Sequence, residues 1–177
     1  MYWFRKPASS KGGYTLVELL LYVAIFSLII GTILAVATSA ADQKIKNQIT
    51  QEVDYQGQLV LTNITQAIRN AAAVNSPTTG NAASLLSLST AIAANNPTVY
   101  DLVQDQSVNK IRLRQGANTT SLLTSSRVTA SKLLFTNRTI TGGKDSIDIT
   151  FTLTYYNPAN KPQLQYQKNF YGTTTLR

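Results

Sequence analysis

Histidine and cysteine, the residues that many enzymes and metal sites depend on, are missing from this sequence of 177 residues. Their absence excludes thiol catalysis, Ser-His-Asp triads, disulfides and metal sites built on Cys or His. Two aspartate pairs, Asp101 with Asp105 and Asp145 with Asp148, could each form half of a calcium site. Two carboxylates are too few for a complete site, so we interpret all four as solvated turn residues. We predict no catalytic residue, no metal and no cofactor.

One carboxylate, Glu18, lies where a charge is costly. It directly precedes residues 19–41, which carry no charge and as a helix would extend about 34 Å, enough to cross the ~30 Å hydrocarbon core of a bilayer. A carboxylate near the centre of such a span costs roughly 2.5 kcal/mol or more. We therefore expect Glu18 to pair with a cation, and an α-amino group released just upstream would serve.

We interpret the apolar run as a membrane span rather than as a signal peptide or a core helix. It is longer than the apolar region of a signal peptide, which has about 7–15 residues, and it has no polar face. Arg5, Lys6 and Lys11 precede it, whereas Asp42 follows it. Because positive charge stays in the cytoplasm, we expect a single pass with the N-terminus inside.

The residues around Glu18 are Lys-Gly-Gly-Tyr-Thr-Leu-Val-Glu-Leu-Leu at positions 11–20, and they resemble the cleavage and methylation signal of type IV prepilins and type II secretion pseudopilins. The resemblance implies that a membrane-embedded prepilin peptidase cuts between Gly13 and Tyr14 and methylates the new N-terminus at Tyr14, where the family more commonly has Phe. It also implies that Glu18 pairs with the N-terminal amine of a neighbouring subunit. The expected partners are the peptidase, other pilin or pseudopilin subunits and an inner-membrane assembly platform.

Helical periodicity continues beyond the apolar run. No proline lies between Pro7 and Pro77, which predicts one helix over about residues 14–73, with Gly31 and Gly57 as weak points that each cost ~1 kcal/mol relative to Ala. Gly31 is equally well explained as a packing contact between helices. In the second half of the helix, apolar residues recur at three-, four- or seven-residue steps and predict one buried face: Ile45, Ile49, Val53, Val60, Ile64, Ala67, Ile68 and Ala71.

After a turn-rich segment, residues 74–81, the period of apolar residues changes to two. This alternation predicts six strands, at about residues 84–89, 98–103, 109–115, 126–136, 146–155 and 163–171. It is clearest in the fifth strand, where one face carries Ile147, Ile149, Phe151, Leu153 and Tyr155. One-sided alternation predicts an antiparallel sheet whose buried face packs on the apolar stripe of the helix.

These elements predict an α+β fold, and the resemblance implies the same pilin-like arrangement, in which a long N-terminal helix packs on an antiparallel β-sheet head. Residues 65–70 and 122–135 look loosely like J-type minor pseudopilins and W-type minor pilins. The chain has no C-terminal disulfide loop of the kind that many major pilins carry, which also favours a minor subunit. The expected segments are a cleaved leader at 1–13, a membrane and filament-core segment at 14–41, an amphipathic helical segment at 42–74 and a β-sheet head at 75–177.

The formal net charge of +8 raises nucleic acid as a further partner. Lys110, Arg112 and Arg114 alternate along one face of a predicted strand, and four tyrosines lie on other strands, namely Tyr155, Tyr156, Tyr166 and Tyr171. A basic face with aromatic rings could bind DNA through phosphate contacts and base stacking. The alternative, which we favour, is an ordinary solvated face of a sheet.

From the sequence we expect a structural, minor subunit of a type IV pilus-like filament, which is a substrate of the prepilin peptidase and not an enzyme. As a precursor it would be anchored in the inner membrane, and after assembly it would lie at the cell surface or in the periplasm. Three alternatives remain open: a type II secretion pseudopilin, a DNA-uptake pilin and a permanently anchored surface domain.

Overall fold

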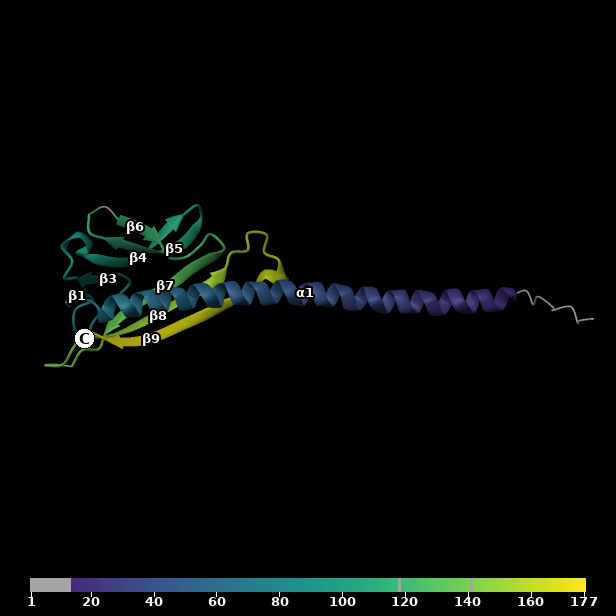
Figure 1. The fold of residues 1–177 in the computed structure, drawn as a ribbon, viewed down its shortest axis with the longest axis horizontal. Helices are drawn as coiled ribbons and strands as arrows, with labels where there is room; N and C mark the ends of the chain where they lie inside the picture. Colours follow the sequence, from purple (N-terminus) through teal and green to yellow (C-terminus); the bar gives the residue numbers. More distant parts are fainter. Residues whose placement is uncertain (1–13, 118, 141) are drawn as a thin grey trace, which may run out of the picture. The chain divides into compact units, whose positions relative to one another are not determined.

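The computed structural model describes residues 14–117, 119–140 and 142–177. Helix α1 (Leu16–Arg69) is followed by strands that form two antiparallel sheets, which is an α+β arrangement (Figure 1). The chain divides into two compact units, one ending at Gln43 and the other covering Lys44–Arg177, and α1 contributes to both. We call residues 16–43 the apolar half of α1, residues 44–69 its head half, and the second unit the head. Gly13 and the predicted leader lie outside the described residues.

The first sheet of the head has five strands in the order β1-β3-β4-β5-β6. β4 and β5 form a long hairpin in which Asp101 faces Arg112 and Val103 faces Lys110. The short 3₁₀-helix η1 (Ala93–Asn95) precedes β4. The strands of this sheet are β1 (Ala73–Ser76), β3 (Leu86–Ser89), β4 (Thr98–Asp105), β5 (Val108–Gln115) and β6 (Thr119–Leu122).

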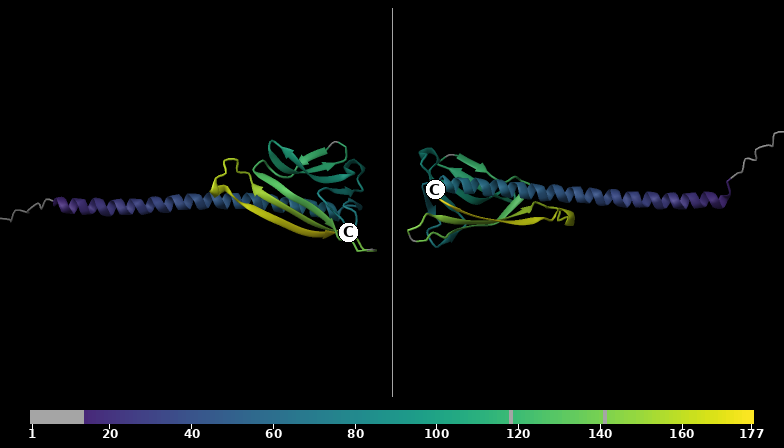
Figure 2. Two further views of the ribbon diagram at one scale, coloured as in Figure 1. Left: turned by 180° about the vertical axis from the view of Figure 1, so that it is seen from behind. Right: turned by 60° about the horizontal axis from the view of Figure 1, so that its bottom comes forward.

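The second sheet has four strands in the order β2-β7-β8-β9. Its pairing shifts in register between Ser131 and Leu134, and a 3₁₀-helix, η2 (Pro162–Leu164), precedes the last strand. In both views of Figure 2, β7, β8 and β9 run alongside the head half of α1. The strands are β2 (Ala82–Ala83), β7 (Val128–Asn137), β8 (Ser146–Tyr155) and β9 (Gln167–Thr175).

The structure corrects several sequence-based expectations about the head. It has two sheets where we expected one, because alternation shows which side of a strand is buried but not which strand is its neighbour. The helix ends at Arg69 rather than near residue 73, and part of the expected turn segment 74–81 is strand β1, which pairs with β3. The last strand begins at Gln167 rather than at residue 163, because Pro162 begins η2. Strands β2 and β6 were not predicted.

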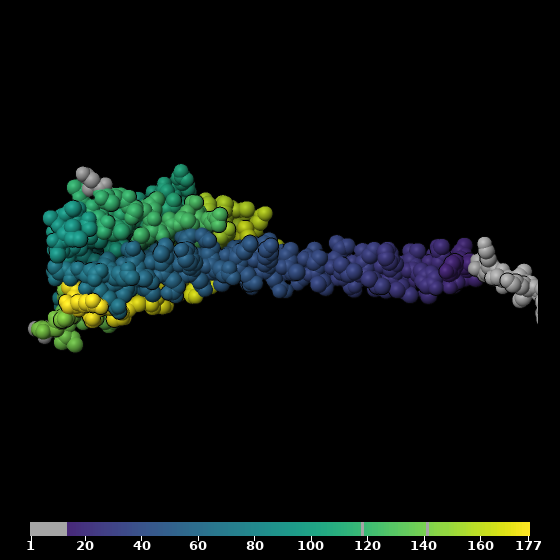
Figure 3. All heavy atoms as spheres, viewed as in Figure 1, coloured from purple at the N-terminus to yellow at the C-terminus, as the bar shows by residue number. Residues whose placement is uncertain are grey.

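The apolar stripe of the helix and the alternation in β8 are confirmed. Ile49, Val53, Val60, Ile64 and Ile68 are all buried, and the last four lie in one cluster together with side chains from both sheets. The outer side of the head half remains at the surface (Figure 3). Ile45, which we expected on the buried stripe, is 40 % exposed, so the buried part of the stripe begins at Ile49. From β8 the cluster receives Ile147, Ile149, Phe151 and Leu153.

Gly57 is a point of close packing between α1 and the second sheet. A Cβ atom at this position would overlap the ring of Phe170, which is buried and stacks on Phe151 with ring centroids 5.1 Å apart. The sequence marked Gly57 as a weak point of the helix. In the structure the missing side chain makes room for an aromatic ring, whose burial contributes on the order of 2 kcal/mol or more.

Two polar contacts fix the head half of α1 in its register. The buried side chain of Gln56 donates from Nε2 to Ser125 Oγ at 2.6 Å and accepts from the Ser125 N–H at 2.9 Å. On the five-stranded sheet, the Tyr100 hydroxyl donates to Asn63 Oδ1 at 2.8 Å, and burial raises the pKa of Tyr100 well above its usual range. Both partners of each contact are satisfied, so these polar groups do not oppose burial of the helix.

Candidate functional site

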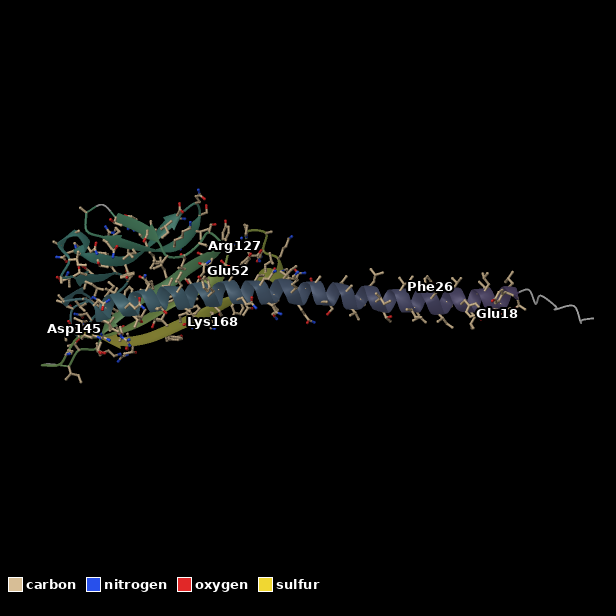
Figure 4. All side chains as sticks on the ribbon, viewed as in Figure 1. Glu18, Phe26, Glu52, Arg127, Asp145 and Lys168 are labelled. Carbon is tan, nitrogen blue, oxygen red and sulfur yellow. The ribbon has the colours of Figure 1, made fainter. Side chains whose placement is uncertain are left out.

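The apolar half of α1 is not covered by the other described residues of its own unit. It contains an 18-residue window of mean hydropathy 2.7 in which no residue is buried, and in the described part of the chain it belongs to the one helix long and apolar enough to cross a membrane. Its large apolar side chains are mostly more than half exposed, for example Leu28 at 71 % and Phe26 at 64 % (Figure 4). An uncovered apolar surface of this length requires lipid or other protein around it.

Three hydroxyl groups within this half donate to backbone carbonyls of the helix itself. Ser27 Oγ donates to the Val23 carbonyl at 2.7 Å, Thr32 Oγ1 to Ile29 at 2.8 Å, and Thr38 Oγ1 to the carbonyls of Leu34 and Ala35 at 3.1 and 3.0 Å. Each hydroxyl therefore keeps its hydrogen bond without water, as a segment in apolar surroundings requires.

Glu18 lies in the first turn of α1, where the helix dipole favours an anion. The Glu18 N–H donates to Thr15 Oγ1 at 3.3 Å, and the Tyr22 hydroxyl donates to Glu18 Oε1 at 3.0 Å. No cationic side chain in the described residues pairs with Glu18, so most of the acceptor positions of its carboxylate have no partner in the chain. Sequence reasoning missed Tyr22, although its spacing of four residues from Glu18 is the usual signal of contact on a helix.

The three predicted nucleic-acid contacts lie in β5 and are engaged with carboxylates of β4. Lys110 Nζ lies 2.7 Å from Asp105 Oδ2, and its side chain is only 9 % exposed. Arg112 binds Asp101 through Nε at 2.8 Å and Nη2 at 2.6 Å, and Arg114 Nη2 lies 3.3 Å from the same carboxylate. The hydrogen bond that Arg112 donates to Asp101 raises the pKa of Arg112, so its guanidinium group stays charged.

This arrangement does not favour DNA binding. The predicted tyrosines Tyr155 and Tyr171 belong to the four-stranded sheet, whereas the cations belong to the five-stranded one. The carboxylates of Asp101 and Asp105 offset the positive charge that a phosphate group would require for binding. Asp101 and Asp105 are therefore strand residues in ion pairs, which corrects their interpretation as solvated turn residues.

Asp145 and Asp148 are likewise engaged with neighbouring side chains. Asp145 Oδ1 accepts from Thr139 Oγ1 at 2.9 Å, while Asp148 accepts from Thr173 Oγ1 at 2.7 Å and pairs with Arg138. No group of three metal-ligating side chains occurs within residues 14–117, 119–140 and 142–177. Asp148 lies within β8, so it is a cross-strand link rather than a turn residue.

We expect Thr173→Val to lower the free energy of unfolding by about 1 kcal/mol at pH 7, because it removes a hydrogen bond to a charged group at a partly exposed site. The hydrogen bond from Thr173 is the main cause of the lowered pKa of Asp148, to which the Arg138 pair adds. A lowered pKa adds stability above the unfolded value near ~3.9, and this stability is lost as the pH falls through the folded pKa. Urea unfolding at several pH values should therefore show the variant approaching the wild type below about pH 4.

Thr175→Val is the matched control, because Thr175 lies on the same strand, is exposed and makes no side-chain hydrogen bond with the described residues. Its free energy of unfolding should follow that of the wild type at every pH. A Thr173→Val deficit that persists unchanged into acid would show that Asp148 is not its origin.

Two ion pairs flank the head half of α1. Asp54 Oδ1 lies 3.0 Å from Lys168 Nζ, and this contact raises the pKa of Lys168. Glu52 Oε2 lies 3.9 Å from Arg127 Nη1 (Figure 4). All four groups are partly exposed, so each pair contributes little to stability.

The chain matches no protein-family model, no curated protein and no solved structure. Its function must therefore be argued from the apolar half of α1, the carboxylate at its start and the surface of the head.

Proposed function

We propose that this chain is the precursor of a structural subunit of a type IV pilin-like filament, anchored by the apolar half of α1 until assembly. The observation that carries the proposal is the contrast within one helix. Its head half is buried against two sheets, whereas its apolar half is not covered by the described residues of its own unit and begins with a carboxylate that no cation of the described residues neutralises. A helix of this kind suits two environments in turn, a bilayer first and a bundle of identical helices afterwards.

Glu18 is the residue that would set the position of each subunit in the bundle. Thr15 and Tyr22 hold the start of the helix and one carboxylate oxygen, and no cation of the described chain neutralises the charge. The N-terminal amine of a neighbouring subunit, released by hydrolysis of the Gly13–Tyr14 bond, is a cation of suitable size. N-methylation keeps the positive charge of this amine, so it preserves the pair.

The same segment supports a type II secretion pseudopilin equally well, because both kinds of subunit use this signal. The proposal is therefore a filament subunit of this class, with the precursor in the inner membrane, its N-terminus in the cytoplasm and its head outside. The prepilin peptidase, other subunits and an inner-membrane assembly platform are its partners. The absence of cysteine favours a minor subunit over a major pilin with a disulfide loop.

The test is the intact mass and N-terminal sequence of the protein from its native membrane, with and without the prepilin peptidase. We expect a chain that begins at Tyr14 and is one methyl group heavier, and we expect this form to disappear when the peptidase is deleted. A chain that still begins at Met1 in cells with the peptidase would identify a permanently anchored surface domain and would contradict the proposal.

A further inference from the structure

A cleft of about 550 Å³ opens on the head beside the end of β8 and the start of β9. Its volume falls within the range of small-molecule sites. No charged side chain of the described residues lines it. The lining consists of three tyrosines, two threonines and four side-chain amides, namely Tyr155, Tyr156, Tyr166, Thr129, Thr154, Asn157, Asn160, Gln165 and Gln167.

Backbone hydrogen bonds hold the tyrosines of the cleft in place. The N–H of Tyr155 donates to the carbonyl of Tyr166 at 2.9 Å, and the N–H of Tyr156 donates to the carbonyl of Arg127 at 2.8 Å. Tyr155 and Tyr166 also pack against the hydrophobic core. Packing thus restricts the rings of Tyr155 and Tyr166 before any ligand arrives, which reduces the entropy cost of binding.

Hydrogen bonds of the side-chain amides hold the loop between β8 and β9 in place. Asn157 binds both sides of the loop, because its Oδ1 accepts from the Lys161 N–H at 3.1 Å and its Nδ2 donates to the Lys161 carbonyl at 2.7 Å. Gln165 Nε2 donates to Asn160 Oδ1 at 3.1 Å. Lys161 and Arg127 therefore form these hydrogen bonds with the lining residues through backbone atoms, and their charged side-chain groups take no part in them.

Several polar groups of the lining have hydrogen-bonding capacity left over. The hydroxyls of Tyr155 and Tyr156 make no hydrogen bond with any other described residue, and the same holds for Gln165 Oε1 and Gln167 Nε2. Hydroxyls can both donate and accept, and the amides of Gln165 and Gln167 add an acceptor and a donor. The half-buried rings supply apolar faces beside these groups.

We propose that this cleft binds a neutral saccharide. A sugar ring presents an apolar C–H face and several hydroxyls that both donate and accept, which matches fixed tyrosine rings bordered by amides. A phosphate, a nucleic acid or an acidic peptide would require a cation in the lining, and the lining has none. The site is on the head, so the inference does not depend on the filament proposal.

The experiment uses the full chain in dodecylphosphocholine micelles, because the headgroup of a maltoside detergent is itself a saccharide. Lactose, cellobiose and N,N′-diacetylchitobiose are tested by saturation-transfer-difference NMR titration, with 3′-sialyllactose as the anionic probe. We expect saturable binding of at least one neutral disaccharide. Tyr156→Ala should weaken it about tenfold, the effect expected when a stacked ring is lost.

Two further variants make the result decisive. Gln165→Ala removes an exposed amide of the lining and should weaken binding while the circular dichroism of the chain is unchanged. Tyr171→Ala is the matched control, because Tyr171 is a 67 % exposed tyrosine of β9 outside the cleft, and it should bind as the wild type does. The proposal is overturned if no neutral probe binds, if only 3′-sialyllactose binds, or if binding survives both lining substitutions.

Discussion

Replacing Glu18 by Ala should abolish filament formation and leave the head as stable as before. Among the described residues, Glu18 makes its hydrogen bonds with the start of α1, where it accepts from Tyr22, so the melting temperature of the head should change by no more than about 2 °C. Assembly should fail because the variant offers no counter-charge to the N-terminal amine of the next subunit. Negative-stain electron microscopy of sheared cell surfaces, with immunoblotting of the membrane fraction, measures both outcomes.

Two further substitutions separate charge from shape. Glu18→Gln keeps the size of the side chain and its ability to accept from Tyr22 but removes the charge, so it should fail like Glu18→Ala. Tyr22→Phe removes the hydrogen bond and keeps the charge, so it should still form filaments. Normal filaments from Glu18→Ala would rule out the proposed role of this carboxylate.

Gly57→Ala should destabilise the head by about 2–3 kcal/mol, although alanine is the better helix former. The added methyl group would occupy the space of the Phe170 ring, which cannot withdraw easily because it is buried and stacked on Phe151. Overpacking of this kind costs 1–3 kcal/mol. Thermal unfolding of the full chain in detergent, followed by circular dichroism in the β-sheet region, should show a melting temperature lower by roughly 8 °C.

Gly31→Ala is the matched control, since it places the same methyl group on the same helix at a position where, apart from the adjacent helix backbone, no atom of the described residues lies within 4 Å. Its melting temperature should equal that of the wild type. The double variant Gly57→Ala, Phe170→Leu should recover part of the lost stability, because the smaller side chain leaves space for the methyl group. Equal melting temperatures for Gly57→Ala and Gly31→Ala would show that the Phe170 ring can move aside at little cost.

Gly57 also shows where sequence reasoning about the fold ends. The periodicity of α1 correctly predicted Ile49, Val53 and Ile64 as buried, because the faces of a helix follow from local geometry alone. The ring beside Gly57 comes from a residue more than a hundred positions away, and no local pattern indicates such a contact. For the same reason the alternation in β8 predicted its buried side but not the division of the strands into two sheets.

The candidate sites likewise differ in whether the local sequence or the tertiary fold determines them. Glu18 is evident from the sequence, because a charge beside a long apolar run is costly wherever the chain folds. The pairing of Asp101 with Arg112 depends on the register of β4 against β5, so Arg112 looks like a free cation until that register is known. The cleft beside β8 joins Thr129 to residues 154–167, and only the tertiary fold places them together.

The self-contained hydroxyls of Ser27, Thr32 and Thr38 have an energetic consequence for a helix that leaves a bilayer. Moving such a helix from lipid tails into a bundle of protein side chains exchanges one water-free environment for another, and these three hydroxyls keep their hydrogen-bond partners in both. The carboxylate of Glu18 then accounts for most of the free-energy cost that polar groups add to the extraction of the helix from the bilayer. For such a subunit, extraction and docking would form a single electrostatic event, in which a carboxylate gains its counter-ion.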